Sequence, residues 1–358
     1  MKNKTIKAVL VPVLLGAASS AALAQEPAQA PGANDNIEKI SIIGSRSFKE
    51  RSVVDSPVPV DIISADDINA VGGTADMTDN LKALIPSYTA TPATGDGSAF
   101  VRPTSLRGTA SDQTLILVDG KRRHRSALVQ FFAPAAGNGA HAPDVGMIPT
   151  IALKRVEVLR DGAASQYGSD AIAGVINFVT KDASEGGSVE LQYGQHYEGE
   201  SSMKLAVNKG LALGEDGFLN LSLEYSDNEA LSRGVIRPDA QALVDAGVEG
   251  VGADSPFGDA PFTQTWGRPE TEALRMFANM GIELDGNKQL YSRLSYADTS
   301  GRYRFFYRNP EIDSIGKSAH SAIQPLLDLG YDGVIADVGF TPFLDGDQTD
   351  FSAIIGLK

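Results

Sequence analysis

The stretch RDGAASQYGSDAIAGVINFVTK, residues 160–181, decides the fold of this chain. Its first half is almost entirely Gly, Ala, Ser and Asp, and its second half contains the β-branched run VINFVT. Glycine permits backbone conformations and close approaches that larger residues block. Gly162, Gly168 and Gly174 are therefore predicted to shape tight turns that lead into a strand. A phosphate-binding loop is a poor alternative, because neither GxxxxGKS nor GxGxxG occurs in the stretch.

Short strands and helices alternate on the amino-terminal side of this stretch. Strands are predicted at 58–64, at 115–120 (LILVDG) and within 151–162, and helices are predicted after Ser64 and from about Thr78. Asp119-Gly120 and Asp161-Gly162 are dipeptides typical of tight turns after strands. Residues 50–182 are thus predicted to form a small α+β domain that is rich in turns.

Beyond residue 185 apolar and polar residues alternate with a period of two. Antiparallel strands are predicted at 188–193, 203–207, 218–226, 274–284, 289–297 and from about Asp350 onward. A soluble β-sandwich gives the same alternation. The connections favour an outer-membrane barrel, since 213–217 and 285–288 are short whereas 227–270 and 308–349 are long.

The number of strands sets a further expectation. Plugged barrels use about 22 strands, and a lumen of about eight strands is filled by side chains alone. Six strands cannot enclose the preceding domain. We therefore expect the chain to be the amino-terminal portion of a longer protein, with about six of the 22 strands.

The amino terminus indicates export. Three lysines precede an apolar run at 8–18, and Ala22-Leu23-Ala24 is typical of a signal peptide cleaved after Ala24. No later stretch reaches the length of a membrane-spanning helix, so entry into a membrane would require strands. The chain has no cysteine, which excludes a disulfide scaffold and a lipoprotein anchor.

The charge of the chain opposes binding to nucleic acid. The net charge is -14, and the basic run KRRHR at 121–125 follows a predicted hairpin turn. We interpret this run as a local solvated or ligand-facing turn.

Residues 25–49 form a polar leader that contains one short β-prone segment. Its members are Glu38, Lys39, Ile40, Ser41, Ile42 and Ile43. The pattern alone fits two alternatives, a strand that joins the sheet edge of another protein and an ordinary first strand of the following domain.

Three blocks resemble the TonB-dependent outer-membrane receptors: LRG at 106–108, LILVDGKR at 115–122 and RVEVLRDGAASQYGSDAIAGVINFVTK at 155–181. The resemblance implies a signal peptide at 1–24, a leader with a TonB box at 25–49, a plug domain at 50–182 and a partial β-barrel at 183–358. It favours the docking alternative for Glu38 to Ile43. The partners that it implies are a TonB-type energy-coupling protein, outer-membrane lipid and a small-molecule ligand of unknown identity.

The resemblance also implies roles for charged residues of the plug. Arg107 and Arg160 are expected to reach acidic groups on the inner barrel wall, and solvated surface charges are the alternative. The residues predicted to shape the plug or to contact the barrel are Arg107, Gly108, Asp119, Gly120, Glu157, Arg160, Gly162, Gly168 and Gly174.

Enzymatic motifs are missing from the sequence. The four histidines are far apart without metal-ligand spacing, and no GxSxG surrounds a serine. We predict no catalytic residue, no metal site and no cofactor. The resemblance implies energy-coupled import of a scarce nutrient, such as a siderophore, vitamin or saccharide, across the outer membrane. The alternative is a truncated, non-transporting plug module that binds the coupling protein.

Overall fold

The computed structural model describes residues 60–71, 77–90, 97–130, 137–249, 266–284, 288–305, 307–308, 329 and 339–358. The predicted signal peptide and the segment Glu38 to Ile43 lie outside the described residues. The chain first forms an α/β unit between Val60 and Thr180 and then a sheet of long strands. None of the helices in the described ranges is long and apolar enough to cross a membrane.

A five-stranded sheet organises the α/β unit, with the strand order β1-β6-β7-β4-β5. The strands are β1 (Val60–Ser64), β4 (Thr114–Val118), β5 (Lys121–Arg122), β6 (Leu153–Leu159) and β7 (Gly174–Thr180). The β4 and β7 strands pair in parallel, and the other neighbours are antiparallel. The edge strand β1 therefore depends on β6 for its backbone hydrogen bonds.

Two helices cover one face of this sheet. They are α2 (Ala65–Ala70) and α3 (Met77–Leu84). Ser64 and Asp67 form a capping box at the start of α2, as the sequence predicts for Ser64. The shorter elements of the unit are β2 (Tyr88–Ala90), η2 (Gly97–Ala99), β3 (Thr104–Leu106), η3 (Ser111–Gln113), η4 (Val145–Met147), η5 (Thr150–Ala152), α4 (Ala164–Tyr167) and η6 (Ser169–Ala171).

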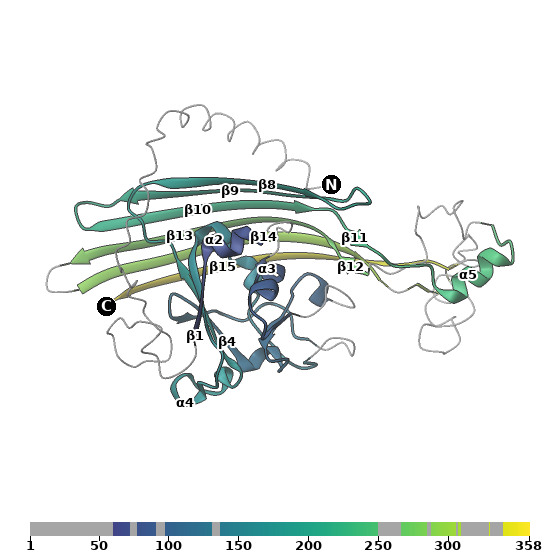
Figure 1. The fold of residues 1–358 in the computed structure, drawn as a ribbon, viewed down its shortest axis with the longest axis horizontal. Helices are drawn as coiled ribbons and strands as arrows, with labels where there is room; N and C mark the ends of the chain where they lie inside the picture. Colours follow the sequence, from purple (N-terminus) through teal and green to yellow (C-terminus); the bar gives the residue numbers. More distant parts are fainter. Residues whose placement is uncertain are drawn as a thin grey trace, which may run out of the picture. The chain divides into compact units, whose positions relative to one another are not determined.

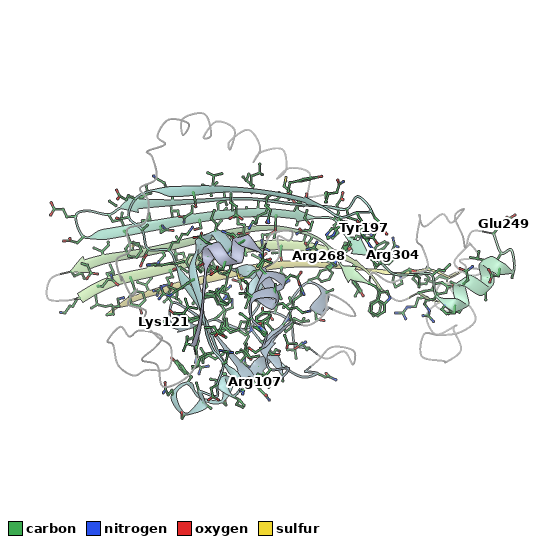
Figure 2. The ribbon with its side chains drawn as sticks, viewed as in Figure 1. Arg107, Lys121, Tyr197, Glu249, Arg268 and Arg304 are labelled. Atoms are coloured by element: carbon green, nitrogen blue, oxygen red, sulfur yellow. The ribbon has the colours of Figure 1, made fainter. Side chains whose placement is uncertain are left out.

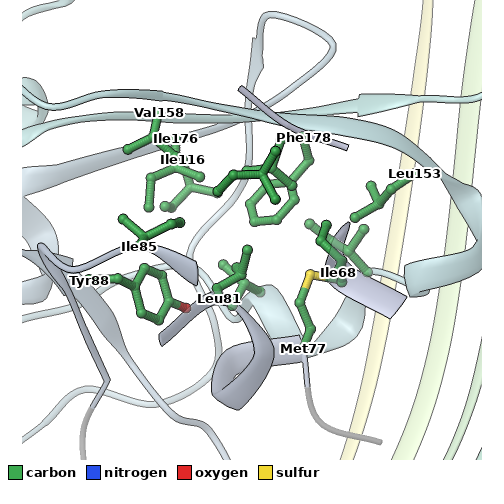
Figure 3. Close-up of a cluster of buried hydrophobic side chains, with 14 of the residues drawn as sticks. Ile68, Met77, Leu81, Ile85, Tyr88, Ile116, Leu153, Val158, Ile176 and Phe178 are labelled. Atoms are coloured by element: carbon green, nitrogen blue, oxygen red, sulfur yellow. The ribbon is translucent and has the colours of Figure 1, made fainter. Parts of the chain in front are cut away.

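The core of the unit lies between the helices and the sheet (Figure 3). Ile68 and Leu81 from the helices pack with Ile116, Ile176 and Phe178 from the strands, and all five are buried. The α/β unit thus has a hydrophobic core of its own.

Six long antiparallel strands follow, in the order β15-β14-β13-β10-β9-β8. They are β8 (Gly187–Gln195), β9 (Ser201–Ala212), β10 (Gly217–Asn228), β13 (Glu270–Leu284), β14 (Lys288–Arg304) and β15 (Phe343–Leu357). Figure 1 shows them side by side as one curved layer. All six predicted strands are confirmed, and each extends further than its alternating core.

Long connections join the strands at one end of the sheet only. The connection from β10 to β13 carries β11 (Leu231–Ser232), α5 (Pro238–Asp245) and β12 (Gly267–Arg268). Tyr307, which follows β14, is buried with Ala240 of α5, so the two long connections pack on each other. At the same end Arg233 pairs with Glu200 and stacks on the Tyr197 ring, 4.6 Å from its centroid. The hydrogen bond from Arg233 lowers the pKa of Glu200.

Candidate functional site

The six-stranded sheet has one face that packs on the α/β unit, which we call the inner face. Inner-face side chains are mainly polar or charged, including Glu224, Arg275, Asn279, Arg293 and Asp350. Unpaired charges in such a place are costly, so each requires a partner. The partners belong to three groups of contacts with the α/β unit.

The first group centres on Glu224 of β10, whose side chain is only 2% exposed. Its Oε2 accepts hydrogen bonds from the backbone N–H of Thr150 at 2.8 Å and from the Thr150 hydroxyl at 2.7 Å. Arg275 of β13 donates to Glu224 Oε1 at 3.2 Å and to the carbonyl oxygen of Gly146 at 2.5 Å. Glu224 and Arg275 together hold the η4 and η5 turns against the inner face.

The buried Lys204 of β9 extends this group along the inner face. Its Nζ lies 2.6 Å from the carboxylate of Glu190 on β8 and 3.3 Å from the Thr150 hydroxyl. Charged residues of four adjacent strands therefore form one connected group, in which Lys204 and Glu224 contact Thr150 directly.

The second group is built on Asp119 in the turn between β4 and β5. Asp119 has φ of 46° and Gly120 has φ of 74°, as a two-residue hairpin turn requires. The Asp119 carboxylate accepts from the Thr180 N–H at 2.8 Å, from the Thr180 hydroxyl at 2.7 Å and from Arg293 Nε of β14 at 2.6 Å. Asn279 of β13 donates to the Thr180 hydroxyl at 3.0 Å.

The third group involves the basic run at 121–125. Arg123 Nη2 lies 2.5 Å from Asp350 Oδ1 of β15, and His124 Nε2 lies 2.6 Å from the other oxygen. Lys121 lies over the Tyr291 ring, 5.5 Å from its centroid. The solvated alternative for the basic run does not hold for Arg123, because its side chain is 6% exposed and paired with the inner face, and the ligand-facing alternative stays a prediction.

An aromatic contact lies nearer the end of the sheet that carries the long connections. Gly301 of β14 and Gly346 of β15 are paired neighbours. A Cβ atom on either glycine would come within 2.6 Å of the Phe100 ring. Phe100 of the α/β unit thus occupies a notch that only glycine leaves open.

A cavity of about 80 Å³ lies between the α/β unit and the inner face, beside these contacts. Phe100, Arg102 and Asp144 line it from one side, and Asn228 and Arg275 line it from the other. The amide oxygen of Asn228 is buried without a hydrogen-bond partner among the described residues.

A buried polar cluster lies inside the five-stranded sheet. Asn177 of β7 accepts from the Gly120 N–H at 2.9 Å and donates to Glu157 Oε2 of β6 at 3.0 Å. Arg155 donates to Glu157 Oε1 at 2.8 Å. Burial raises the pKa of Glu157 in spite of the opposing hydrogen bonds from Asn177 and Arg155.

Two arginines predicted to reach the barrel wall bond within the α/β unit among the described residues, and their contact with the wall stays a prediction. Arg107, labelled in Figure 2, has a positive φ of 59° and donates to the carbonyl oxygens of Ile172 and Ala173 within the α/β unit. Arg160 follows β6 and pairs at 2.8 Å with Asp61 of the neighbouring strand β1. Among the described residues, Arg123, Arg275 and Arg293 each link the α/β unit to the six-stranded sheet.

The predicted glycines lie in turns and at close approaches. Gly108, Gly120, Gly168 and Gly174 have positive φ. Gly162 has an ordinary φ, and a Cβ atom there would lie 3.2 Å from the Ile172 carbonyl oxygen. Gly174 is the most restricted, since a Cβ atom would collide with the Leu159 carbonyl oxygen.

Metal-binding groups are also missing from the part of the chain that the structure describes, where no three His, Cys, Asp or Glu residues gather in a suitable cluster.

The opposite face of the six-stranded sheet is apolar. On β13 it presents Leu274, Met276, Ala278, Met280, Ile282 and Leu284. Tyr225 and Tyr296 lie at the end of this band toward the long connections, and Asp227 and Asp298 follow them. An apolar band edged by aromatic side chains is typical of a lipid-facing surface.

Comparison with known proteins agrees with this architecture. Residues 52–175 match the family model described as TonB-dependent Receptor Plug Domain. The chain is 32% identical to the vitamin B12 transporter BtuB of Vibrio cholerae over 195 residues, which cover 53% of this chain and 28% of that protein. It is 31% identical to the iron-regulated outer membrane virulence protein of Vibrio cholerae, over 50% of this chain and 24% of that protein. The chain thus spans about a quarter of the length of these relatives.

Solved structures share the fold. The siderophore receptor PirA of Acinetobacter baumannii gives a TM-score of 0.51 at 19% identity, covering 84% of this chain and 38% of that one. A variant of the ferric enterobactin receptor PfeA of Pseudomonas aeruginosa gives 0.50 at 21% identity, covering 69% and 34%. From these findings we conclude that residues 52–175 match the plug domain of TonB-dependent receptors, and that the chain is similar in sequence to the vitamin B12 transporter BtuB and in fold to siderophore receptors.

Proposed function

We propose that this protein is an outer-membrane receptor that imports a scarce small-molecule nutrient with energy supplied from the periplasm. One observation carries the proposal: a plug domain is held by ion pairs and hydrogen bonds on the inner face of a sheet whose other face is an apolar band. A plug placed in this way would close a lumen and would have to move for a solute to pass.

The height of the apolar band supports a membrane location. Leu274 and Leu284 are ten residues apart on β13. At about 3.3 Å per residue the band runs about 33 Å along the strand, and a tilt of about 40° reduces its height to about 25 Å. This equals the height of the apolar band of outer-membrane barrels, which is about 25 Å.

The long connections support a role in ligand capture. They lie at one end of the sheet and pack on each other through Tyr307 and α5, whereas the connections at the other end are short. Outer-membrane barrels have long extracellular loops and short periplasmic turns. We assign the long-connection end to the cell exterior and the leader to the periplasm.

Relatives of this chain include a vitamin B12 transporter and siderophore receptors. We extend the class of cargo to this protein only as far as a scarce nutrient such as a siderophore, vitamin or saccharide. The proposed docking site for the coupling protein is the segment Glu38 to Ile43, by strand addition.

The test is an Ile42→Pro variant of the protein expressed from its own gene. Proline removes a backbone donor and fixes φ, so strand addition fails at that position. We expect energy-dependent uptake of the nutrient to be abolished while binding to cells persists. A matched Ile42→Val variant, which keeps the backbone donor, is expected to retain uptake. Unchanged uptake in Ile42→Pro would remove the docking assignment.

A further inference from the structure

A continuous series of buried polar contacts runs from the inner face of the barrel sheet to β6 of the plug. Arg293 of β14 donates to Asp119 at 2.6 Å, and Gly120 in the same turn donates to Asn177 at 2.9 Å. Asn177 donates in turn to Glu157 at 3.0 Å. Glu157 and Asn177 are both buried.

The direction of each hydrogen bond in this series is fixed. The Gly120 N–H can only donate, so it holds the amide oxygen of Asn177 toward the turn. The NH₂ group of Asn177 must then face Glu157, which accepts it as a carboxylate. Rotation of the Asn177 amide would break the contacts on both sides at once. Asn177 can therefore keep both hydrogen bonds only while the turn and β6 hold their present positions relative to each other.

The far end of the series lies beside the edge strand of the plug. Glu157 is the direct register partner of Ile62 on β1. β1 is the first strand that the structure describes, and in the sequence it follows the leader that contains Glu38 to Ile43. A displacement of the leader toward the periplasm would therefore act first on the pairing of β1 with β6.

We propose that Asn177 and Glu157 are positioning residues that couple the pairing of β1 with β6 to the anchoring of the Asp119–Gly120 turn on Arg293. The inference rests on the proposed function, in which the leader receives the energy input. Separation of β1 admits water to Glu157, which weakens its bond to Asn177 and frees the Gly120 end of the turn. Coupling between two equilibria is reciprocal, so loss of Arg293 makes β1 easier to open.

The experiment tests the reciprocal effect, that loss of Arg293 makes β1 easier to open. A single introduced thiol can report it, because the 358-residue sequence contains no cysteine. An Ile62→Cys substitution provides one thiol at the half-buried position opposite Glu157. Its labelling by a small maleimide is measured on isolated outer membranes, without ligand and without an energised inner membrane. Adding Arg293→Met is expected to raise the labelling rate about tenfold, the population change expected when a hydrogen bond to a charged group is lost.

Three companion variants distinguish coupling through this series of hydrogen bonds, which we call the relay, from a general loosening of the plug. Arg275→Met removes another arginine anchor, one that donates to Gly146, Glu224 and Ser226, and it is expected to leave the labelling rate within about twofold. Arg293→Lys restores the charge and is expected to return the rate toward that of the parent. In an Asn177→Leu background, Arg293→Met is expected to add nothing further, because the series is already cut.

Equal effects of Arg293→Met and Arg275→Met, or an undiminished Arg293→Met effect in the Asn177→Leu background, would overturn the relay. If Arg293→Met does not assemble, Asp119→Asn cuts the same link and is judged by the same criteria. The labelling needs no transport, so its outcome is independent of the Ile42→Pro uptake result. A labelling result that contradicts the relay therefore does not contradict the proposed function. An uptake result that contradicts the proposed function likewise does not change the measured coupling.

Discussion

Glu224→Gln is the substitution that examines most closely how the plug is held. The Glu224 carboxylate accepts two hydrogen bonds from Thr150 and one from Arg275. Glutamine has the same shape but replaces one acceptor oxygen with an NH₂ donor. That donor must face either the Thr150 N–H or the Arg275 guanidinium, and both are donors themselves. At least one buried donor loses its partner.

The magnitude follows from the number of bonds lost. Hydrogen bonds to charged groups contribute about 1.5–3 kcal/mol each, and an unpaired buried donor costs a similar amount. Arg275 keeps its bond to the Gly146 carbonyl oxygen, which limits the loss. We expect opening of the plug from the inner face to become easier by about 2–3 kcal/mol. The open population then rises about 30- to 150-fold.

The assay is the rate of trypsin cleavage within the plug of the detergent-solubilised protein. Where reclosing is faster than cleavage, this rate follows the open population. Asp298→Asn is the matched control, because it also converts a carboxylate to an amide but lies on the apolar side of the sheet beside Thr349. Cleavage of Glu224→Gln within about twofold of the parent would refute the claim that Glu224 anchors the plug.

Three further predictions concern the plug, and Gly186→Ala, which lies outside it, is the control for the first. Gly174→Ala combines a φ of 144° with a collision at the Leu159 carbonyl oxygen, and it is expected to cost about 3 kcal/mol or more and to deplete folded protein in outer membranes. Gly186→Ala, with φ of 74° and open space, should cost only about 1 kcal/mol. Phe100→Ala empties the notch beside the paired glycines, and because Phe100 is only half-buried the cost should stay below the about 3–5 kcal/mol of a fully buried Phe→Ala change and should appear as faster trypsin cleavage of the plug. The raised pKa of Glu157 means that its folded form binds a proton more tightly than its unfolded form. The parent should therefore gain stability relative to Glu157→Gln as pH falls through the folded pKa, with the full gain below the ordinary value of 4.5, as measured by denaturant unfolding at several pH values. A difference between parent and variant that does not change with pH would contradict the assignment.

The elements of the fold follow closely from local pattern, because each depends on its own residues. The capping box at Ser64 and Asp67 uses side chains three residues apart, and the Asp119-Gly120 turn needs only two residues that tolerate positive φ. The six strands are recognisable from the alternation of apolar and polar side chains.

The contacts between plug and sheet could not be predicted from local sequence pattern. Arg107 and Arg160 lie in the most recognisable blocks of the plug, yet both bond within it. The anchoring residues Arg275 and Arg293 come from the sheet, and their partners lie more than a hundred positions away in the sequence. Which arginine meets which carboxylate depends on how two folded parts pack, and no local pattern encodes that geometry.

One signal for these anchors was present in the sequence. Glu224, Arg275 and Arg293 are charged residues on the polar side of strands that are otherwise apolar on the other side. A charge at the middle of a barrel strand faces the lumen, where only a partner from the plug or from a neighbouring strand can neutralise it. Such positions identify plug anchors before the partner is known.

The most direct test of the central claim is a cross-link between the leader and the energy-coupling protein in living cells. The sequence holds no cysteine, so Ile42→Cys introduces a single thiol, and a series of single cysteines in the coupling protein supplies the other. Strand addition predicts disulfides at positions of alternating register, and a cysteine placed instead at the exposed Tyr197 should form none. Cross-links at Ile42→Cys that follow this alternation and disappear with Ile40→Pro would establish the docking strand. Absence of any cross-link from Ile42→Cys, in cells whose receptor is present in the outer membrane, would contradict the account.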